Sequence, residues 1–294
     1  MNIVGARMDT VSDIAALRQR LAGLEAERLP GAAAAFSLGA EGPEANGARL
    51  ACGALHEVQA VRAADLPAAT GFTLALALRA ADAGRQGAGA PARPILWVRQ
   101  DLADVELGRL DAPGLATLGF DPARLILVRA SDAEAVLRAA GDAVRCPGLG
   151  GLVIEPWGEP KALDLTATRR LSLRAASSGV TAFLLHAVAR AAPSAVATRW
   201  RVAPAASVPS GLERAAGAPG RPAFAVTLLR HRGGEGSRPV EGGTWNLEWD
   251  RETSSFRDLA ALPRAVVPVP AGGPAGAAAA PAGGGEIVAL RRTG

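Results

Sequence analysis

Short runs of consecutive apolar residues recur through the middle of the chain, and segments with helical periodicity separate them. A strand that is apolar throughout is buried on both faces, and this happens when helices cover both faces of a mostly parallel sheet. The pattern therefore predicts an α/β fold built on such a sheet. The strand candidates are residues 55–58, 95–98, 125–128, 152–154 and 180–185, and the helix candidates are residues 71–81, 113–119, 131–144 and 164–178.

The pattern changes towards both ends of the chain. Further strand candidates at residues 198–203, 223–231 and 244–250 are joined by Gly- and Pro-rich loops. They predict a strand-rich C-terminal extension with antiparallel pairs. Ahead of the sheet, residues 9–29 carry apolar side chains at spacings of three and four, which predicts a helix. This helix packs either on its own domain or on a partner, and the small residues 31–49 after it are expected to form a linker.

These changes divide the chain into three parts. Residues 1–50 hold the N-terminal helix and linker, and residues 51–258 hold the α/β domain with its extension. Residues 259–294 are expected to be a disordered tail, because residues 265–285 consist mostly of Pro, Gly and Ala.

Composition agrees with a folded domain and limits the kinds of protein this chain can be. Of its 294 residues, 49% are hydrophobic and 20% are charged, the balance of a globular protein. No apolar run reaches the roughly 18 residues of a membrane span, and the charged N-terminal stretch does not resemble a signal peptide. Cys52 and Cys146 form no CxxC pair. We therefore expect a cytoplasmic protein without a disulfide framework.

The excess positive charge lies in the last third of the chain. Residues 1–198 contain 20 basic and 20 acidic residues, whereas residues 199–294 contain 12 and 8, which accounts for the net charge of +4. One interpretation is that arginine serves as a solubilising surface residue. The other is weak, sequence-independent contact with DNA phosphates. The arginines assigned to that contact are Arg199, Arg201, Arg230 and Arg232.

The connection from the first strand to the first helix is where a P-loop would bind phosphate. A P-loop needs glycines whose backbone N–H groups face the phosphates, a Lys, and a Ser or Thr for Mg²⁺. Gly71 and Thr73 have the spacing of the GKT end of that motif, but Phe72 stands in the Lys position and the earlier Gly is missing. We therefore expect a vestigial P-loop position that binds no nucleotide or other cofactor.

Polar residues follow two other strand candidates at the same edge of the sheet. Glu155 follows residues 152–154, where an ATPase has its Mg²⁺-directing acid; the alternative is a structural carboxylate. Gln100 and Asp101 follow residues 95–98 and have the chemistry to orient a catalytic water. Because the phosphate Lys is missing, we expect Glu155 to be a vestigial acid and the chain to have no catalytic residue.

No other catalytic or metal-binding pattern appears in the sequence. The histidines lack the spacing of a metal site: His56, His186 and His231. We expect His56 to be packed or hydrogen-bonded, and Cys146 to be a small buried hydrophobic residue instead of a nucleophile. Three tryptophans of the strand-rich part either pack in the core or stack on bases: Trp200, Trp245 and Trp249.

Seven stretches, in chain order, carry a resemblance to a known family. They are residues 55–58, 69–72, 95–101, 119–126, 145–149 through 163–171, 197–202 and 245–249. Together they resemble the inducible mutagenesis protein A family of bacteria, a branch of the RecA-type core. The resemblance implies a RecA-like sheet whose ATP site has decayed, because Phe72 replaces the phosphate Lys.

The resemblance also implies a function. It points to a non-enzymatic adaptor in SOS-induced translesion synthesis, whose partners are a Y-family-like polymerase homologue and an error-prone polymerase. The RecA recombinase and DNA are further candidate partners. Two other functions stay open, namely a divergent P-loop-type ATPase that couples nucleotide to DNA binding, and a short SOS inhibitor of cell division. The length of the chain and its strand-rich extension speak against the inhibitor.

The end of the chain predicts a separate contact. Large apolar residues reappear at Ile287, Val288 and Leu290 after the Pro/Gly/Ala-rich residues 265–285. Val288 and Leu290 alternate as they would on an added β-strand, and the preceding tether would keep the segment near a partner. The alternative is a tail that folds back on its own domain.

Overall fold

A computed structural model of the chain describes residues 35–39, 49–83, 92–187, 192–207, 220–232 and 242–259. The chain divides into two units, Met1–Leu262 and Pro263–Gly294, and all of these residues belong to the first. Three predicted features lie outside the described residues: the helix at 9–29, the tail at 265–285, and the partner segment with Ile287, Val288 and Leu290.

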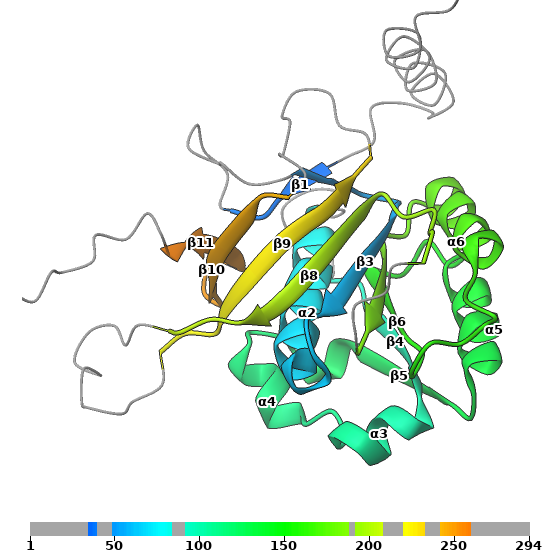
Figure 1. Cartoon of the computed structure of the whole chain (residues 1–294), viewed down its shortest axis with the longest axis horizontal. Coiled ribbons are helices and arrows are strands. Elements are labelled where there is room, and N and C mark those ends of the chain that lie inside the picture. Colours follow the sequence, from blue (N-terminus) through cyan, green and yellow to red (C-terminus); the bar gives the residue numbers. More distant parts are fainter. Residues whose placement is uncertain are drawn as a thin grey trace, which may run out of the picture. The chain divides into compact units, whose positions relative to one another are not determined.

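The centre of the described unit is a nine-stranded sheet (Figure 1). Its strands are β3 (Leu55–Ala60), β4 (Ile95–Gln100), β5 (Leu125–Ala130), β6 (Gly151–Glu155), β7 (Ala182–His186), β8 (Thr198–Pro204), β9 (Ala223–His231), β10 (Thr244–Asp250) and β11 (Ser255–Asp258). They lie in the order β11-β10-β9-β8-β3-β7-β6-β4-β5. Neighbours from β8 to β5 in this order are parallel, whereas β8 to β11 pair antiparallel. This is the fold class predicted from the sequence, an α/β fold on a mostly parallel sheet with a strand-rich extension.

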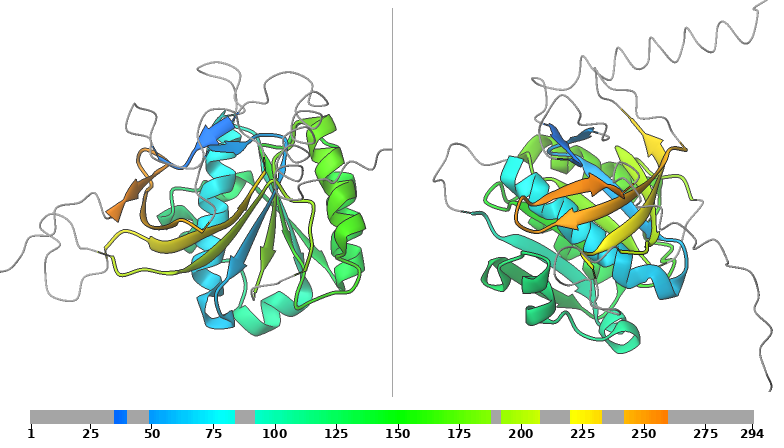
Figure 2. Two further views of the ribbon diagram at one scale, coloured as in Figure 1. Left: turned by 45° about the horizontal axis from the view of Figure 1, so that its top comes forward. Right: turned by 90° about the vertical axis from the view of Figure 1, so that its left-hand side faces the viewer.

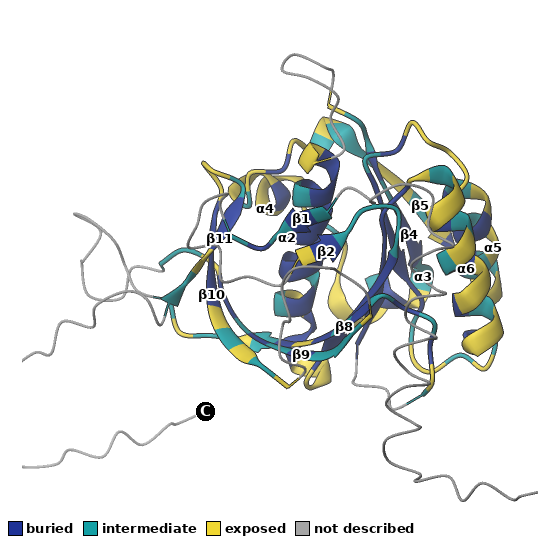
Figure 3. Cartoon of the chain, turned by 90° about the horizontal axis from the view of Figure 1, so that it is seen from above, coloured by how far each residue is buried: buried dark blue, intermediate teal, exposed yellow. Residues whose placement is uncertain are grey.

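Helices cover the two faces of the sheet differently. The helices are α2 (Leu66–Ala83), α3 (Asp101–Leu107), α4 (Ala112–Thr117), α5 (Ala133–Ala143) and α6 (Leu165–Ser178). α2 lies on one face and is buried over most of its length, as expected for a helix that is apolar all round. The antiparallel part of the sheet curls around it (Figures 2 and 3). α5 and α6 pack on the other face, each with one buried and one exposed side (Figure 3).

Aspartate N-caps set where three helices begin. The carboxylates of Asp111, Asp132 and Asp164 accept hydrogen bonds of 2.7–2.8 Å from backbone N–H groups three residues further on. Each satisfies a donor that the helix itself leaves unpaired. α6 ends at Gly179, whose φ of 77° is a left-handed conformation that glycine adopts without strain. These local signals explain why the predicted bounds of α5 and α6 agree with the structure.

The predicted linker at residues 31–49 is wrong where the structure describes it. Residues 35–37 form β1 (Ala35–Ser37), which pairs antiparallel with β2 (Arg49–Ala51). Phe36 and Leu38 are buried in the core around α2. The Arg79 guanidinium of α2 donates hydrogen bonds to the carbonyl oxygens of Ser37 and Gly39 at 2.6 and 2.8 Å. The segment is held by tertiary contacts that its small, Gly-rich sequence does not reveal.

Two further elements were not predicted. α3 begins directly after β4, in a stretch we expected only to carry Gln100 and Asp101 as water-orienting residues. β11 is a four-residue edge strand next to β10. Both are too short to show a clear period in sequence.

The alternation of side chains along β3 places a polar residue among apolar ones. Val58 and Ala60 belong to the core around α2, whereas Leu55 belongs to the core under α5 and α6. Because side chains alternate, Glu57 and Gln59 share the face of Leu55. Figure 1 shows that α5 and α6 leave β8, β9 and β10 uncovered on this face.

Candidate functional site

The carboxyl ends of parallel strands are where α/β proteins bind ligands, and the β3–α2 connection lies at one of these ends. It consists of the five residues 61–65, and the last three form a 3-10 turn (Ala63–Asp65). It contains neither Gly nor Lys. The backbone therefore cannot wrap a phosphate as a P-loop does, and no ammonium group is at hand to neutralise one.

An aspartate occupies the end of this connection. The Arg62 guanidinium donates hydrogen bonds to both carboxylate oxygens of Asp65, at 3.1 and 2.9 Å. These hydrogen bonds, with the charge of Arg62, lower the pKa of Asp65. Asp65 directly precedes α2, so a negative charge stands at the helix N-terminus where a P-loop protein holds phosphate.

The structure corrects the predicted P-loop position. Gly71, Phe72 and Thr73 lie inside α2, more than one turn after its start at Leu66, and all three are buried. The Phe72 ring packs in the core, with its centroid 5.2 Å from that of Phe256. The Thr73 hydroxyl donates to the carbonyl oxygen of Ala69 at 2.7 Å. These residues build the helix and the core, and the GKT-like spacing is a coincidence of an apolar helix.

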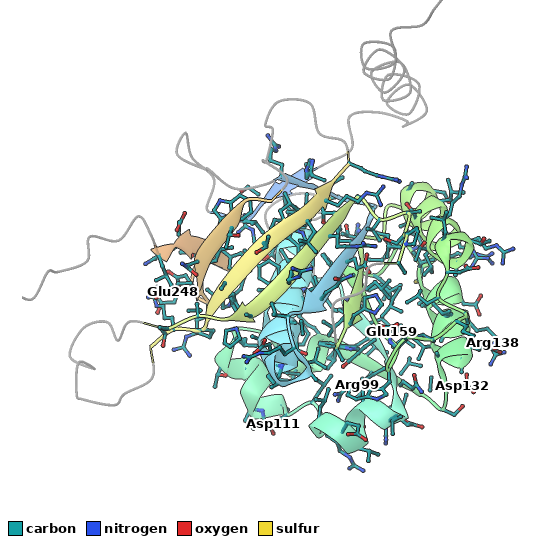
Figure 4. The ribbon with its side chains drawn as sticks, in the orientation of Figure 1. Arg99, Asp111, Asp132, Arg138, Glu159 and Glu248 are labelled. Carbon is teal, nitrogen blue, oxygen red and sulfur yellow. The ribbon has the colours of Figure 1, made fainter. Side chains whose placement is uncertain are left out.

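Glu155, the predicted vestigial acid, ends β6, and one of its two carboxylate oxygens is engaged by side chains of β4, whereas the other is buried without a hydrogen-bond partner among the described residues. Its Oε2 accepts a hydrogen bond of 2.9 Å from the Trp97 indole and lies 3.0 Å from Arg99 Nε. Burial raises the pKa of Glu155 to about 7, against the opposing effects of Arg99 and Trp97. The guanidinium of Arg99, which is labelled in Figure 4, also donates a hydrogen bond to the Asp104 carboxylate of α3. The carboxylate is the buried end of an ion-pair network, which agrees with the structural alternative.

The two water-orienting candidates serve structural contacts. Gln100 accepts a hydrogen bond of 2.9 Å from the backbone N–H of Trp157, which fixes the loop after β6. Asp101 begins α3 and lies 3.1 Å from the Arg129 guanidinium of β5. Arg129 also pairs with Asp104, so Asp101 lies at the outer end of the same ion-pair network whose buried end is Glu155.

A second polar cluster lies on the α6 side of the sheet and was missed by the sequence reasoning. Glu57 accepts hydrogen bonds from Arg199 at 2.7 Å, Ser194 at 3.0 Å and Gln59 at 2.9 Å. Arg199 and Ser194 donate to Oε2, whereas Gln59 donates to Oε1, from which His186 Nε2 lies 3.2 Å away. Burial alone would raise the pKa of Glu57, but these partners together lower it to about 2. A Glu inside an apolar strand run was the signal available in the sequence.

One of the arginines predicted to contact DNA, Arg199, belongs to this cluster. Arg199 uses its guanidinium on Glu57, on Ser194 and on the Ala192 carbonyl oxygen, so it is not available for phosphate. Arg230 donates to the Ser194 carbonyl oxygen at 2.9 Å and is half-buried.

The other two arginines of that group stay open to solvent. Arg201 lies on the helix-free face of β8, and Arg232 follows the end of β9. Within the described part of the chain, neither side chain has a hydrogen-bond or ion-pair partner.

The remaining aromatic and histidine residues are structural. His56 is buried between the Thr198 hydroxyl at 2.8 Å and the Ala51 carbonyl oxygen at 2.9 Å, as expected for a hydrogen-bonded histidine. Trp200 and Trp249 are buried and Trp245 packs against the same core, which confirms the core interpretation over base stacking.

Cys146 departs from expectation. It is exposed on the turn after α5, because the helix ends at Ala143 and the chain reverses there before β6.

Within the described ranges, no group of three or more His, Cys, Asp or Glu side chains could hold a metal ion. No helix in those ranges is long and apolar enough to cross a membrane.

Comparison with known proteins gives one sequence relative in two strains. The chain is 40% identical over 153 residues to Protein ImuA of Caulobacter vibrioides strain NA1000 / CB15N and of strain ATCC 19089 / CIP 103742 / CB 15. The match covers 47% of this chain and 56% of the relative, so the chain spans little more than half the length of the proteins it matches. This similarity is consistent with the inducible mutagenesis protein A family, the family that the seven stretches resemble.

No protein-family model matches the chain. A crystal structure of the RadB recombinase aligns with a TM-score of 0.41 and 14% identity, over 69% of this chain and 90% of that chain.

Proposed function

We propose that the chain is a non-catalytic, RecA-like accessory protein of SOS-induced mutagenesis. The observation that carries this proposal is the ion pair of Arg62 and Asp65 at the start of α2. The Arg62 guanidinium is engaged by Asp65, so the connection of residues 61–65 offers no unpaired cation for a triphosphate, whereas a P-loop depends on one there. The engagement of Glu155 by Arg99 and Trp97 supports it, because a metal-directing acid has to face the solvent side of the site.

The partners follow from the family resemblance and are part of the proposal. We infer that the chain assembles in the cytoplasm with a Y-family-like polymerase homologue and an error-prone polymerase. The RecA recombinase is a further partner of the same assembly. DNA contact, if the assembly needs this chain for it, would use Arg201 and Arg232, which are exposed, and not Arg199.

The experiment separates an accessory role from an ATPase role. In a bacterium that carries the gene, deletion should lower damage-induced mutation frequency, and the wild-type gene should restore it. Genes with Asp65→Asn or Glu155→Gln should restore it equally well, because the proposed role needs neither nucleotide nor metal. The proteins should be checked for equal abundance, since both carboxylates lie in structural ion pairs.

Nucleotide binding gives the second measurement. Equilibrium dialysis of the full chain with Mg²⁺ and ATP should show no binding in the micromolar range. Micromolar binding that Glu155→Gln removes at unchanged stability, together with loss of mutagenesis in that variant, would instead establish the divergent ATPase. Full mutagenesis in the deletion strain would overturn the accessory role itself.

A further inference from the structure

Two helices of the described unit expose large apolar side chains, and the charged residues within each helix are of a single sign. In α3, Leu102 is 42% and Val105 is 77% exposed; in α6, Leu165 is 50% and Leu173 is 63% exposed. An exposed Leu or Val is ordinary when it stands alone. The charges arranged around these side chains are what distinguish the two surfaces.

The outer surface of α3 is apolar in the middle and acidic on both sides. Residues three and four apart are neighbours on a helix surface. Val105 therefore lies beside Asp101, Leu102 lies beside Glu106, and the two apolar residues adjoin each other. Glu106 has no side-chain partner within the described part of the chain, and Asp101 is half-exposed beside Arg129.

The outer surface of α6 has the opposite charge. Arg169 and Arg170 precede Leu173 by four and three residues, so both guanidinium groups flank it. α6 contains three arginines and no acidic residue. Within the described residues, Arg169 and Arg170 have no side-chain partner. The buried side of the helix is formed by other residues, namely Thr168, Leu171 and Ala175.

We propose that α3 of one copy of this chain docks on α6 of a second copy. Leu173 would pack against Leu102 and Val105, while Arg169 and Arg170 would face Asp101 and Glu106. The high exposure of Val105 and Leu173 shows that the two surfaces do not cover each other within one chain. α3 lies at the carboxyl ends of the strands and the outer face of α6 points away from the sheet (Figure 1).

Because the two surfaces differ, the contact is heterologous. Each copy has one surface of either kind, so copies assemble head to tail into a ring or an open chain. Two short helices bury less than the roughly 1,600 Å² of a standard interface, so self-association is weak and depends on concentration. Its charges make it sensitive to salt.

A second copy explains both surfaces, whereas other occupants explain only one. The phosphates of DNA or of an anionic membrane would pair with Arg169 and Arg170. They would leave the apolar Leu173 without a contact and would be repelled by α3. On a second copy, Leu173 has an apolar complement in Leu102 and Val105, and the two arginines have an acidic one.

The first test is sedimentation velocity of the full chain over a concentration series at low salt. The average mass should rise with concentration and return to that of the monomer in high salt. Leu173→Ser and Val105→Ser should each abolish the rise. Val61→Ser, which changes a 41% exposed residue away from both helices, is the matched control and should behave as wild type.

The decisive experiment mixes the Val105→Ser variant with the Leu173→Ser variant. A Val105→Ser chain keeps an intact α6 surface and a Leu173→Ser chain keeps an intact α3 surface. Their equimolar mixture should therefore form dimers and nothing larger. A monomeric mixture, or association of either single variant at the wild-type level, would overturn the proposal, as would a wild-type chain that stays monomeric throughout.

A charge exchange tests the proposed pairing. Glu106→Arg and Arg170→Glu should each weaken association at least tenfold, and the two changes in one chain should restore it. Arg138→Glu reverses an exposed arginine on the neighbouring helix α5 and should have no effect (Figure 4). If Arg170→Glu instead lowers binding to single-stranded DNA or to phosphatidylserine vesicles and leaves self-association unchanged, the α6 surface serves that ligand and the proposal is wrong.

Discussion

At the scale of single residues, Arg99 holds together the buried charges at the carboxyl end of β4. It lies 3.0 Å from Glu155 and donates to Asp104, and all three side chains are nearly inaccessible. Removing one partner from a buried pair leaves a charge with neither water nor counter-ion. The network is thus more costly to break than a surface pair of the same residues.

Arg99→Met should therefore lower the free energy of unfolding by about 3–5 kcal/mol at pH 8. The loss should shrink towards pH 5. The pKa of the Glu155 carboxyl is raised from its ordinary value of 4.5 to about 7 in the folded protein. The contribution of Glu155 to the free energy of unfolding therefore falls as the pH rises from about 4.5 through about 7. Urea unfolding at the two pH values measures this. Arg129→Met is the control, because Arg129 also pairs with Asp104 but is half-exposed; it should cost less than about 1 kcal/mol. Equal losses would contradict the network.

His56 offers a second prediction at this scale. Burial lowers the pKa of His56 to about 4, so the ring stays neutral in the fold at neutral pH. The Ala51 carbonyl oxygen accepts from Nε2–H, and Nδ1 accepts from the Thr198 hydroxyl. The unfolded chain binds a proton at about pH 6.5, so stability from this residue is complete above that value and is lost as pH falls towards about 4.

NMR of the histidine ring protons can test this directly. The chain has three histidines, and a His56→Asn variant identifies the resonance of His56. That resonance should not shift between pH 5 and 7 in the folded protein. A midpoint near 6.5 would show that the ring is solvated and that the hydrogen bonds to Thr198 and Ala51 are not formed.

At the scale of elements, α2 is a core helix and not a phosphate-binding helix. Phe72 packs against Trp200, Phe224 and Phe256, with ring centroids 5.2–5.9 Å apart. Phe72→Ala should destabilise the fold by about 3–5 kcal/mol through the lost transfer energy and the cavity. Phe72→Leu should cost clearly less, because most of the apolar volume remains.

The Phe72→Lys variant tests whether position 72 belongs to the core or to a nucleotide-binding loop. It would create the Lys of a P-loop, but inside the core it should unfold the chain or lower its melting temperature more than Phe72→Ala does. Thermal unfolding and ATP dialysis provide the two readouts. A stable Phe72→Lys variant that gains ATP affinity would show that residues 71–73 are a nucleotide position after all.

At the scale of the whole molecule, the antiparallel extension turns one face of the sheet to solvent. Arg201 lies on that face and Arg232 at the end of β9, whereas Arg199 is paired with Glu57. If the chain binds DNA through this region, Arg201→Ala with Arg232→Ala should weaken single-stranded DNA binding. The slope of log affinity against log salt should fall by about one for each contact removed.

Arg199→Ala should behave differently in the same assay. It should destabilise the fold, because it leaves the Glu57 carboxylate buried, and it should not change the salt slope at temperatures where the protein is folded. Fluorescence anisotropy with a labelled oligonucleotide gives the slopes. If the Arg201/Arg232 variant binds as wild type does, the exposed arginines serve solubility.

Most strands of the large sheet and its longer helices could be predicted from local sequence because local chemistry determines them, whereas β1, α3 and β11 could not. Consecutive apolar residues at 95–98, 125–128 and 152–154 predicted β4, β5 and β6 and their parallel arrangement. The expected burial on both faces is wrong for β5, because this strand lies at the edge of the sheet and exposes Ile126 and Leu127. The aspartates before α5 and α6 set the starts of those helices within a few residues.

Only the tertiary structure decided which polar residues meet. Glu57 and Arg199 are 142 residues apart in sequence, and Trp97 and Glu155 are 58 apart. Their contacts depend on strand order and register, which result from the packing of the whole sheet and leave no periodic trace in the chain. The same packing started α2 at Leu66, ahead of the predicted start at residue 71, so residues 71–73 lie in the core and not at the beginning of the helix. The sequence therefore determined the elements and the absence of a phosphate Lys, whereas long-range packing determined the site.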